Sequence, residues 1–161
     1  MKTLSTIWRL VAGLVVVSSV ASAQLLVENF SYTAATLLTA NGWTAHSGGG
    51  TNAVAVTASG LTYANYASSA IGNAAAIVAS GEDVNRTFAS QISGSVYAAF
   101  MVNVTSATTA GEYFFHLYQS STIFKGRVFV RLAANSNLTF GISKQGTTSN
   151  LISWSDSTYA T

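Results

Sequence analysis

Aromatic and cationic side chains recur at alternate positions in two consecutive segments. One segment reads Glu112-Tyr-Phe-Phe-His-Leu-Tyr118, and the next reads Phe124-Lys-Gly-Arg-Val-Phe-Val-Arg-Leu132. Alternate residues of a β-strand point to the same face, so pairing of these segments as neighbouring strands would gather such side chains on one face. The candidate ligand-binding residues on that face are Phe114, His116, Tyr118, Arg127, Phe129 and Arg131.

Two interpretations of this face follow from its chemistry. Aromatic planes flanked by hydrogen-bond donors suit sugar rings, so the face could bind extracellular glycans. Alternatively, the face packs on a second sheet or on a neighbouring domain, with the arginines at its margin.

The carboxylates do not form a catalytic pattern. Glycoside hydrolysis needs two carboxylates about 5 to 9.5 Å apart. Glu82 and Asp83 are adjacent and would point to opposite faces of a strand, while Glu112 stands alone. The chain also lacks a Gly-x-Ser-x-Gly nucleophile elbow and a phosphate-binding glycine loop that precedes a helix. We therefore expect no catalytic residues and no enzymatic activity.

Metal binding has little support in the sequence. His46 and His116 have no paired spacing. Glu82 and Asp83 could offer oxygens to calcium, which needs several such ligands, but no Asp-x-Asp repeat accompanies them. We expect this pair to lie in a solvated turn, and we predict no metal site and no cofactor.

The composition favours an extracellular β-protein. Charged residues make up 7% of the chain, against about 25% in typical domains. Beyond residue 23, five basic residues balance five acidic ones, so no basic patch is available for nucleic acid. There is no cysteine, which excludes disulfides and thiolate chemistry.

Residues 1–23 have the pattern of a signal peptide. Lys2 and Arg9 precede a short apolar run, and Ala21-Ser22-Ala23 is a small-x-small cleavage site. The apolar run is shorter than the roughly 20 residues that cross a bilayer. We expect a secreted or cell-surface protein with no membrane span after the signal is removed, and a domain over residues 24–161.

Short runs rich in β-branched and aromatic residues alternate with turn residues, which is typical of antiparallel strands. The Asn41-Gly42-Trp43 turn is expected to place its tryptophan in the core. The predicted strands cover residues 25–30, 52–57, 75–79, 84–89, 94–104, 112–118, 124–132 and 137–143. Together they predict an all-β antiparallel sandwich of jelly-roll type.

Several of these segments resemble a known family. Leu26-Val-Glu-Asn-Phe-Ser-Tyr32, Gly81-Glu-Asp-Val-Asn-Arg-Thr-Phe88 and Val96-Tyr-Ala-Ala-Phe-Met-Val-Asn-Val104 resemble the N-terminal domain of large secreted proteins of Bacteroidetes-type bacteria. Those proteins often end in a type nine secretion sorting domain. The resemblance implies a concanavalin A-like or laminin-G-like jelly roll, and its packing and turn motifs carry no site residue.

The resemblance also bears on the C-terminus. In such proteins the domain continues past a Thr-Tyr pair, whereas Thr158-Tyr159 lies near the end of this chain. We therefore expect the sandwich to lack its last strands.

From these observations we expect a non-catalytic extracellular binding or adhesion module, glycan binding included, within a larger secreted or cell-surface protein. Its expected partners are extracellular glycans or cell-surface components. Two alternatives remain open. One is a structural subunit that self-associates through an open β-edge. The other is an accessory domain of a larger secreted enzyme.

Overall fold

A computed structural model describes residues 24–120, 123–146 and 149–160. The predicted signal peptide, residues 1–23, lies outside this part of the chain. The described residues form antiparallel β-strands together with two short 3-10 helices, η1 (Leu38–Asn41) and η2 (Ser149–Leu151). The predicted all-β antiparallel class is confirmed. None of the described helices is long and apolar enough for a membrane crossing.

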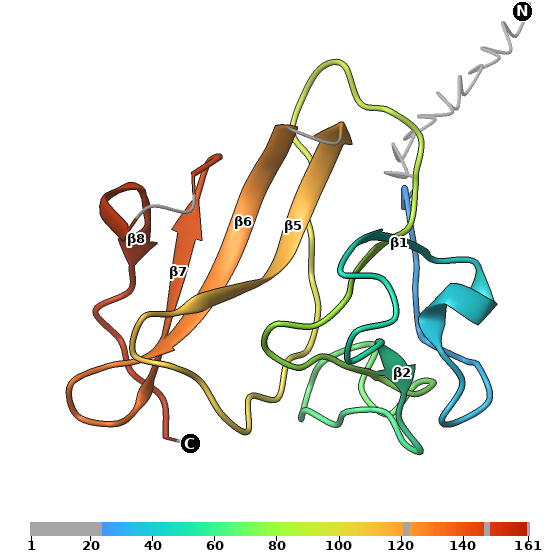
Figure 1. Cartoon of the computed structure of the whole chain (residues 1–161), viewed down its shortest axis with the longest axis horizontal. Coiled ribbons are helices and arrows are strands. Elements are labelled where there is room, and N and C mark those ends of the chain that lie inside the picture. The colour runs from blue at the N-terminus through green and yellow to red at the C-terminus, as the bar shows by residue number, and fades with distance from the viewer. Residues whose placement is uncertain (1–23, 121–122, 147–148, 161) are drawn as a thin grey trace, which may run out of the picture.

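The largest element is a four-stranded sheet in the C-terminal part of the chain (Figure 1). The predicted strands at 112–118, 124–132 and 137–143 are all present. Val, Ile, Phe and Tyr dominate the two longest strands, as expected for a pleated, half-buried surface. In spatial order the strands are β5 (Glu112–Ser120), β6 (Ile123–Leu132), β7 (Leu138–Ser143) and β8 (Ser153–Trp154).

The N-terminal part contains two small two-stranded sheets. Strand β1 (Thr44–Ser47) pairs with β4 (Asp83–Asn85), and β2 (Ala55–Val56) pairs with β3 (Ala75–Ala76). Strands β2 and β3 lie within the predicted strands at 52–57 and 75–79, and β4 overlaps the predicted strand at 84–89. All three are much shorter than predicted. Strand β1 was not predicted.

A small apolar core holds this N-terminal part together. It consists of buried Leu38, Val54 and Val56, and Trp43 packs against it. Gly42 ends the η1 helix at a φ of 81°, a left-handed conformation that glycine adopts without steric cost. The predicted turn that brings Trp43 to the core is therefore confirmed.

Two predicted strands are absent. Residues 25–30 and 94–104 pair with no other described strand. The backbone of the second segment instead runs along one side of the large sheet, behind β5 and β6 in the view of Figure 1. The Phe100 ring lies 4.9 Å from that of Phe115, and Val102 and Val104 line a hollow shared with Leu138. The segment thus contacts the large sheet without making a backbone ladder, and the side chains of Phe100 and Val102 remain 42% and 44% exposed.

Candidate functional site

The pairing of β5 with β6 decides which side chains share a face. Tyr113 lies opposite Phe129 and Tyr118 lies opposite Phe124, but the register shifts between these pairs. Gly126 has a φ of 55°, the conformation of a glycine bulge, and a bulge interrupts the regular alternation of side chains. As a result, Phe124 lies on the same face as Arg127, whose Cζ is 4.4 Å from the ring centroid.

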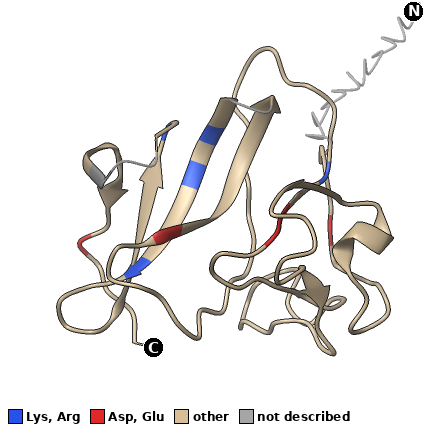
Figure 2. Ribbon diagram, in the orientation of Figure 1, with Lys and Arg blue, Asp and Glu red and all other residues tan. Residues whose placement is uncertain are grey.

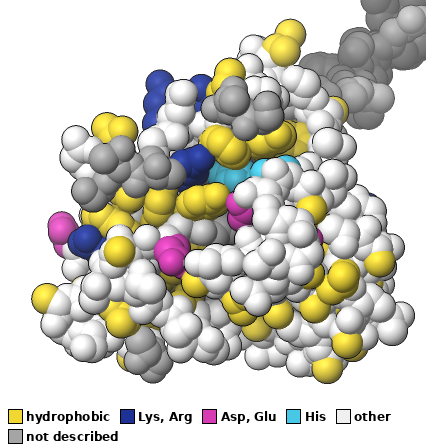
Figure 3. Space-filling model, viewed as in Figure 1, with side chains coloured by type: hydrophobic (Ala, Val, Ile, Leu, Met, Phe, Trp, Pro, Cys, Tyr) yellow, Lys and Arg dark blue, Asp and Glu magenta, His cyan; other side chains and the backbone are white. Residues whose placement is uncertain are grey.

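We call the resulting surface the aromatic–arginine face. It draws on both parts of the molecule, because β1 contributes a histidine beside the large sheet. Figure 3 shows histidine side chains in a hollow, flanked by hydrophobic and basic side chains. The members of the face are His46 from β1, Tyr113, His116 and Tyr118 from β5, Phe124, Arg127, Phe129 and Arg131 from β6, and Trp154 from β8.

One of the six predicted site residues lies elsewhere. The Phe114 ring contacts Phe100 at 5.9 Å and Phe140 at 6.2 Å, on the side that residues 94–104 cover. The predicted alternation also separated Tyr113 from His116, whereas their ring centroids are 5.5 Å apart. Both departures follow from the register shift between Tyr113 and Phe115, which changes the face of the residues that follow.

The remaining predicted residues lie together but are unequally exposed. The Phe129 side chain is only 3% exposed, so its ring belongs to the packed interior beneath the face. Tyr118 is 37% exposed and can present its ring to a ligand. His116 and Arg131 are intermediate. The face therefore has a buried aromatic part that includes Phe129 and a more exposed part that includes Tyr118.

The two arginines contact aromatic rings. Arg127 is 7% exposed, and its Cζ lies 4.9 Å from the centroid of the Tyr113 ring as well as close to Phe124. The Cζ of Arg131 is 4.0 Å from the Trp154 ring. Such cation–π contacts are attractive, and more so where water is excluded. In the described chain, however, the single ion pair joins Arg86 to Glu28, away from these arginines.

Trp154 reaches Arg131 because two glycines leave space for it. A Cβ at Gly141 would lie 2.7 Å from the indole, and one at Gly111 would lie 2.8 Å from it. Both distances are too short for a real side chain. The indole therefore packs against Gly111 and Gly141, beside Arg131 and with its ring centroid 6.2 Å from that of Phe129.

Two histidines join the large sheet to β1. The ring centroids of His46 and His116 are 5.6 Å apart. Burial lowers the pKa of His116, and electrostatic repulsion from His46 and Arg127 lowers it further, while Asp83 acts in the opposite direction. The hydroxyl of Tyr113 donates a 3.2 Å hydrogen bond to Asp83. Burial and the Asp83 carboxylate raise the pKa of Tyr113.

Several polar atoms of the face have no hydrogen-bond partner although they are buried. Within the described residues, this group comprises Nε2 of His46, Nδ1 of His116, Nε of Arg127, Nε of Arg131 and Nε1 of Trp154. Buried polar groups in native proteins are normally hydrogen-bonded, and each exception calls for an explanation such as an absent ligand or water. Their concentration on one face marks it as the candidate functional site.

The prediction that Glu82 lies in a solvated turn is wrong. Its side chain is 5% exposed. The carboxylate accepts hydrogen bonds from the backbone N–H groups of Gly50, at 2.8 Å, and Val54, at 3.4 Å. Glu82 therefore fixes the glycine-rich loop. The part of the chain that the structure describes contains no cluster of three potential metal-binding side chains.

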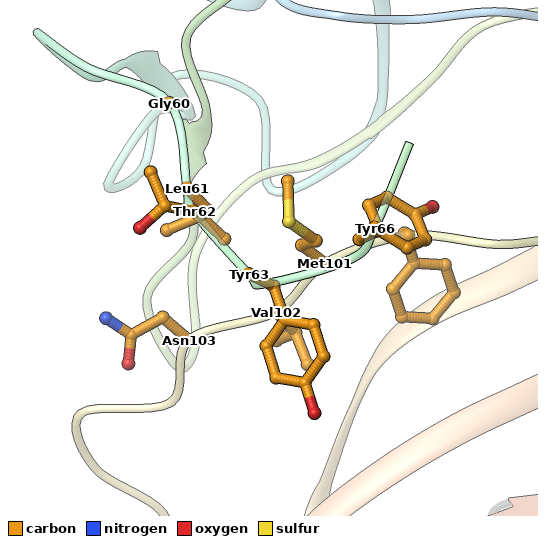
Figure 4. A pocket seen from close by; sticks show the side chains of 9 residues that line it. Gly60, Leu61, Thr62, Tyr63, Tyr66, Met101, Val102 and Asn103 are labelled. Atoms are coloured by element: carbon orange, nitrogen blue, oxygen red, sulfur yellow. The ribbon is translucent and has the colours of Figure 1, made fainter. Parts of the chain in front are cut away.

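A second hollow, of about 570 Å³, lies between residues 60–66 and residues 100–103 (Figure 4). Its lining includes Tyr63, Tyr66 and Met101, and no charged side chain. Tyr63 is 71% exposed. This hollow lacks the buried, unpaired donors of the aromatic–arginine face and is the weaker candidate.

Sequence reasoning missed four members of the face, namely His46, Tyr113, Phe124 and Trp154. An isolated glycine inside a strand pattern often marks a bulge, so Gly126 was the available signal for Phe124. Nothing in the local pattern places His46 near β5, because 70 residues separate it from His116 along the chain.

Comparison with protein-family models, curated proteins and solved structures gave no significant match. The proposals below therefore rest on the residues and their geometry.

Proposed function

We propose that this protein is a non-catalytic extracellular binding module that recognises glycans through the aromatic–arginine face. One observation carries the proposal: five buried side-chain nitrogens without partners lie together on this face. Ligand sites typically combine an aromatic lining with a few convergent polar groups. Sugars offer hydroxyl acceptors for such donors and apolar ring faces for aromatic side chains.

The proposal includes the setting of the protein. The pattern of residues 1–23 supports export to the cell surface or the medium. The antiparallel, helix-poor architecture supports an all-β fold, and the proposal adds that this fold is a jelly-roll sandwich of concanavalin A-like type, as in the Bacteroidetes-type secreted proteins that the sequence resembles. An experimental structure with two stacked sheets in jelly-roll order would test this relationship.

Tyr118→Ala tests glycan binding at the face. Stacking on an aromatic ring is worth about 1 kcal/mol, so we expect a several-fold weaker Kd for any glycan that a glycan array identifies. Tyr63→Ala is the matched control, because Tyr63 is a more exposed tyrosine away from this face. Circular dichroism should show that both variants remain folded. The proposal fails if no glycan binds, or if the two variants weaken binding equally.

A second function is favoured by the outer edge of β5. This nine-residue strand ends the large sheet, and its outer side makes no backbone hydrogen bond to other described residues. Unpaired strand edges are templates for pairing with another chain. The alternative is therefore a structural subunit that self-associates through β5.

Light scattering across a range of protein concentrations tests self-association. The alternative predicts that the mass rises with concentration and that Gln119→Lys, a charge on the edge strand, keeps the protein monomeric. A mass that stays monomeric at all concentrations excludes it.

A further inference from the structure

The aromatic–arginine face contains a buried cation that forms no ion pair with the residues that the structure describes. Arg127 is 7% exposed, and its Nε has no hydrogen-bond partner among the described residues. Removing a charge from water is costly unless the charge is paired and hydrogen-bonded. The rings of Tyr113 and Phe124 offset part of this cost. They cannot accept the in-plane hydrogen bonds of a guanidinium, so the group retains its capacity for an anion.

Arg131 repeats this arrangement further along the same strand. Its guanidinium lies over Trp154, and its Nε is also buried and without a partner. The indole N–H of Trp154 adds another unused donor beside it. Four residues of strand separate Arg127 from Arg131, which corresponds to about 13 Å on the same face. Two such positions suit an extended ligand with repeated acidic groups better than a single small anion.

The described acidic residues form no ion pair with Arg127 or Arg131. Glu112 is opposite Val130 in the ladder, on the other side of the sheet from Arg131. Asp83 accepts the Tyr113 hydroxyl hydrogen bond. Figure 2 shows the basic residues of the large sheet along β6, with the acidic residues on other segments. Charge complementarity therefore points to an anionic ligand.

We propose that the ligand is an acidic oligosaccharide whose uronate carboxylates pair with Arg127 and Arg131. A guanidinium is planar and matches a carboxylate bidentately, which is geometrically more selective than a point charge. Tyr118, whose ring is 37% exposed on this face, would contact a sugar ring. This inference rests on the proposed glycan-binding function and specifies the class of glycan.

Isothermal titration calorimetry of the purified chain tests the inference with matched ligands. Hexamers of galacturonate and of mannuronate provide the carboxylates. The fully methyl-esterified galacturonate hexamer keeps the same backbone without charge, and a sulfated galactan hexamer carries a different anion. We expect binding of at least one uronate hexamer, a Kd that weakens as salt is added, and little binding of the ester or the sulfated sugar.

Two arginine variants and one lysine variant locate the contact. Loss of a charged hydrogen bond predicts that Arg131→Gln weakens uronate binding about tenfold or more, and Arg127→Lys should weaken it because lysine lacks the planar fork. Lys125→Ala is the control: it removes a cation from the same strand, but this ammonium contacts Gln145 rather than the aromatic rings. Because Arg127 is buried, thermal unfolding should confirm that its variant is folded, and the exposed part of Arg131 provides an independent test.

The outcomes separate this inference from the function on which it rests. Equal binding of the uronate and its methyl ester, or binding of the sulfated hexamer alone, would overturn the uronate inference and leave glycan binding intact. Equal weakening by Arg131→Gln and Lys125→Ala would show that net charge suffices, and would also overturn it. If no saccharide binds at all, both proposals fail.

Discussion

The two parts of this molecule are held together differently. Residues 24–111 contain only short strands, and two buried or half-buried carboxylates organise their loops. Glu28 accepts hydrogen bonds from Tyr32 and Trp43, and Glu82 fixes Gly50 and Val54. The four-stranded sheet instead has long backbone ladders and a continuous series of aromatic contacts.

The polar groups of the two parts differ in the same way. In the N-terminal part, the buried carboxylates have their partners within the chain. On the large sheet, the arginines and the indole keep donors that no described residue uses. Polar groups that are satisfied internally stabilise a fold, whereas buried polar atoms without a partner call for an explanation, and a bound ligand is one. This contrast is the reason for assigning the site to the large sheet.

Phe129→Ala should produce the largest loss of stability, because it removes a ring that is 3% exposed from the floor of the sheet. Truncation of a buried phenylalanine costs about 4 kcal/mol, measurable as a lower free energy of unfolding in urea. Tyr97→Ala is the control, since Tyr97 is 90% exposed. A similar, small effect of both variants would contradict the description of Phe129 as a core residue.

Glu82→Ala should produce the second largest loss of stability, and it tests whether the Glu82 carboxylate holds the glycine-rich loop of the N-terminal part in place. The variant leaves the N–H groups of Gly50 and Val54 without their acceptor, which we expect to cost about 3 kcal/mol. Glu82→Gln should cost less, because the amide oxygen can still accept one of these bonds. Glu112→Ala, at an exposed position, should change the free energy of unfolding little. An equal loss at Glu82 and Glu112 would show that the loop does not depend on the carboxylate.

Low pH should reduce the stability of the N-terminal part, because Glu28 becomes protonated. The loss should be smaller than that of Glu82→Ala, because Arg86, the ion-pair partner of Glu28, is exposed to water. Burial acts to raise the pKa of Glu28, but hydrogen bonds from Tyr32, the Phe30 N–H and Arg86 outweigh it and lower that pKa below its ordinary value. A lowered carboxyl pKa stabilises the fold above the unfolded pKa of about 4.3, and this stability is lost as the pH falls through the folded pKa.

Chemical denaturation between pH 6 and pH 2 would measure this loss. Glu28→Gln removes the titrating group, so its stability should depend less on pH in that range than that of the original protein. Parallel pH profiles for the two proteins would refute the role of Glu28.

The smallest effect is expected at His116, in the large sheet. Its pKa is lowered, mainly by burial and then by His46 and Arg127, with Asp83 opposing; Tyr113 and Tyr118 also face it. The folded protein therefore favours the neutral ring. Its stabilising contribution is present above the unfolded pKa of about 6.5 and is lost as the pH falls through the folded pKa.

Thermal unfolding at pH 8 and pH 5 would detect this contribution. His116→Gln should reduce the difference in Tm between the two pH values, with the pH 8 comparison controlling for lost packing. An unchanged difference would mean that the ring titrates equally in the folded and unfolded states.

The strands of the large sheet could be predicted because β-branched and aromatic residues are concentrated in β5, β6 and β7. Residues 94–104 show why the same pattern fails elsewhere: Phe100 and Val102 contact the sheet from a segment that has no ladder, and both side chains stay exposed. Apolar alternation indicates contact with other apolar groups, and such contact does not require a paired strand. The pattern therefore cannot distinguish the two cases.

Most of the candidate site was also predictable, with one physical limit. Strict alternation assigned Phe114 to the face and left out Tyr113 and Phe124, because bulges change the face without changing the sequence pattern. The anchoring by Glu82 could not be foreseen, since its partner Gly50 lies 32 residues away. Long-range hydrogen bonds of this kind leave no local periodicity.

The slot that Gly111 and Gly141 leave for Trp154 gives the protein a built-in optical probe of the site. Trp154 lies against Arg131, whereas Trp43 donates a hydrogen bond to Glu28 in the other part of the molecule. In a protein that begins at Gln24, and so lacks Trp8, Trp43→Phe leaves Trp154 as the fluorophore that reports on ligand binding and on melting of the large sheet. With Trp154→Phe, Trp43 would follow the N-terminal core. Coincident melting curves from the two fluorophores would mean that the parts unfold as one cooperative unit, and separate curves would mean that the binding sheet can open independently.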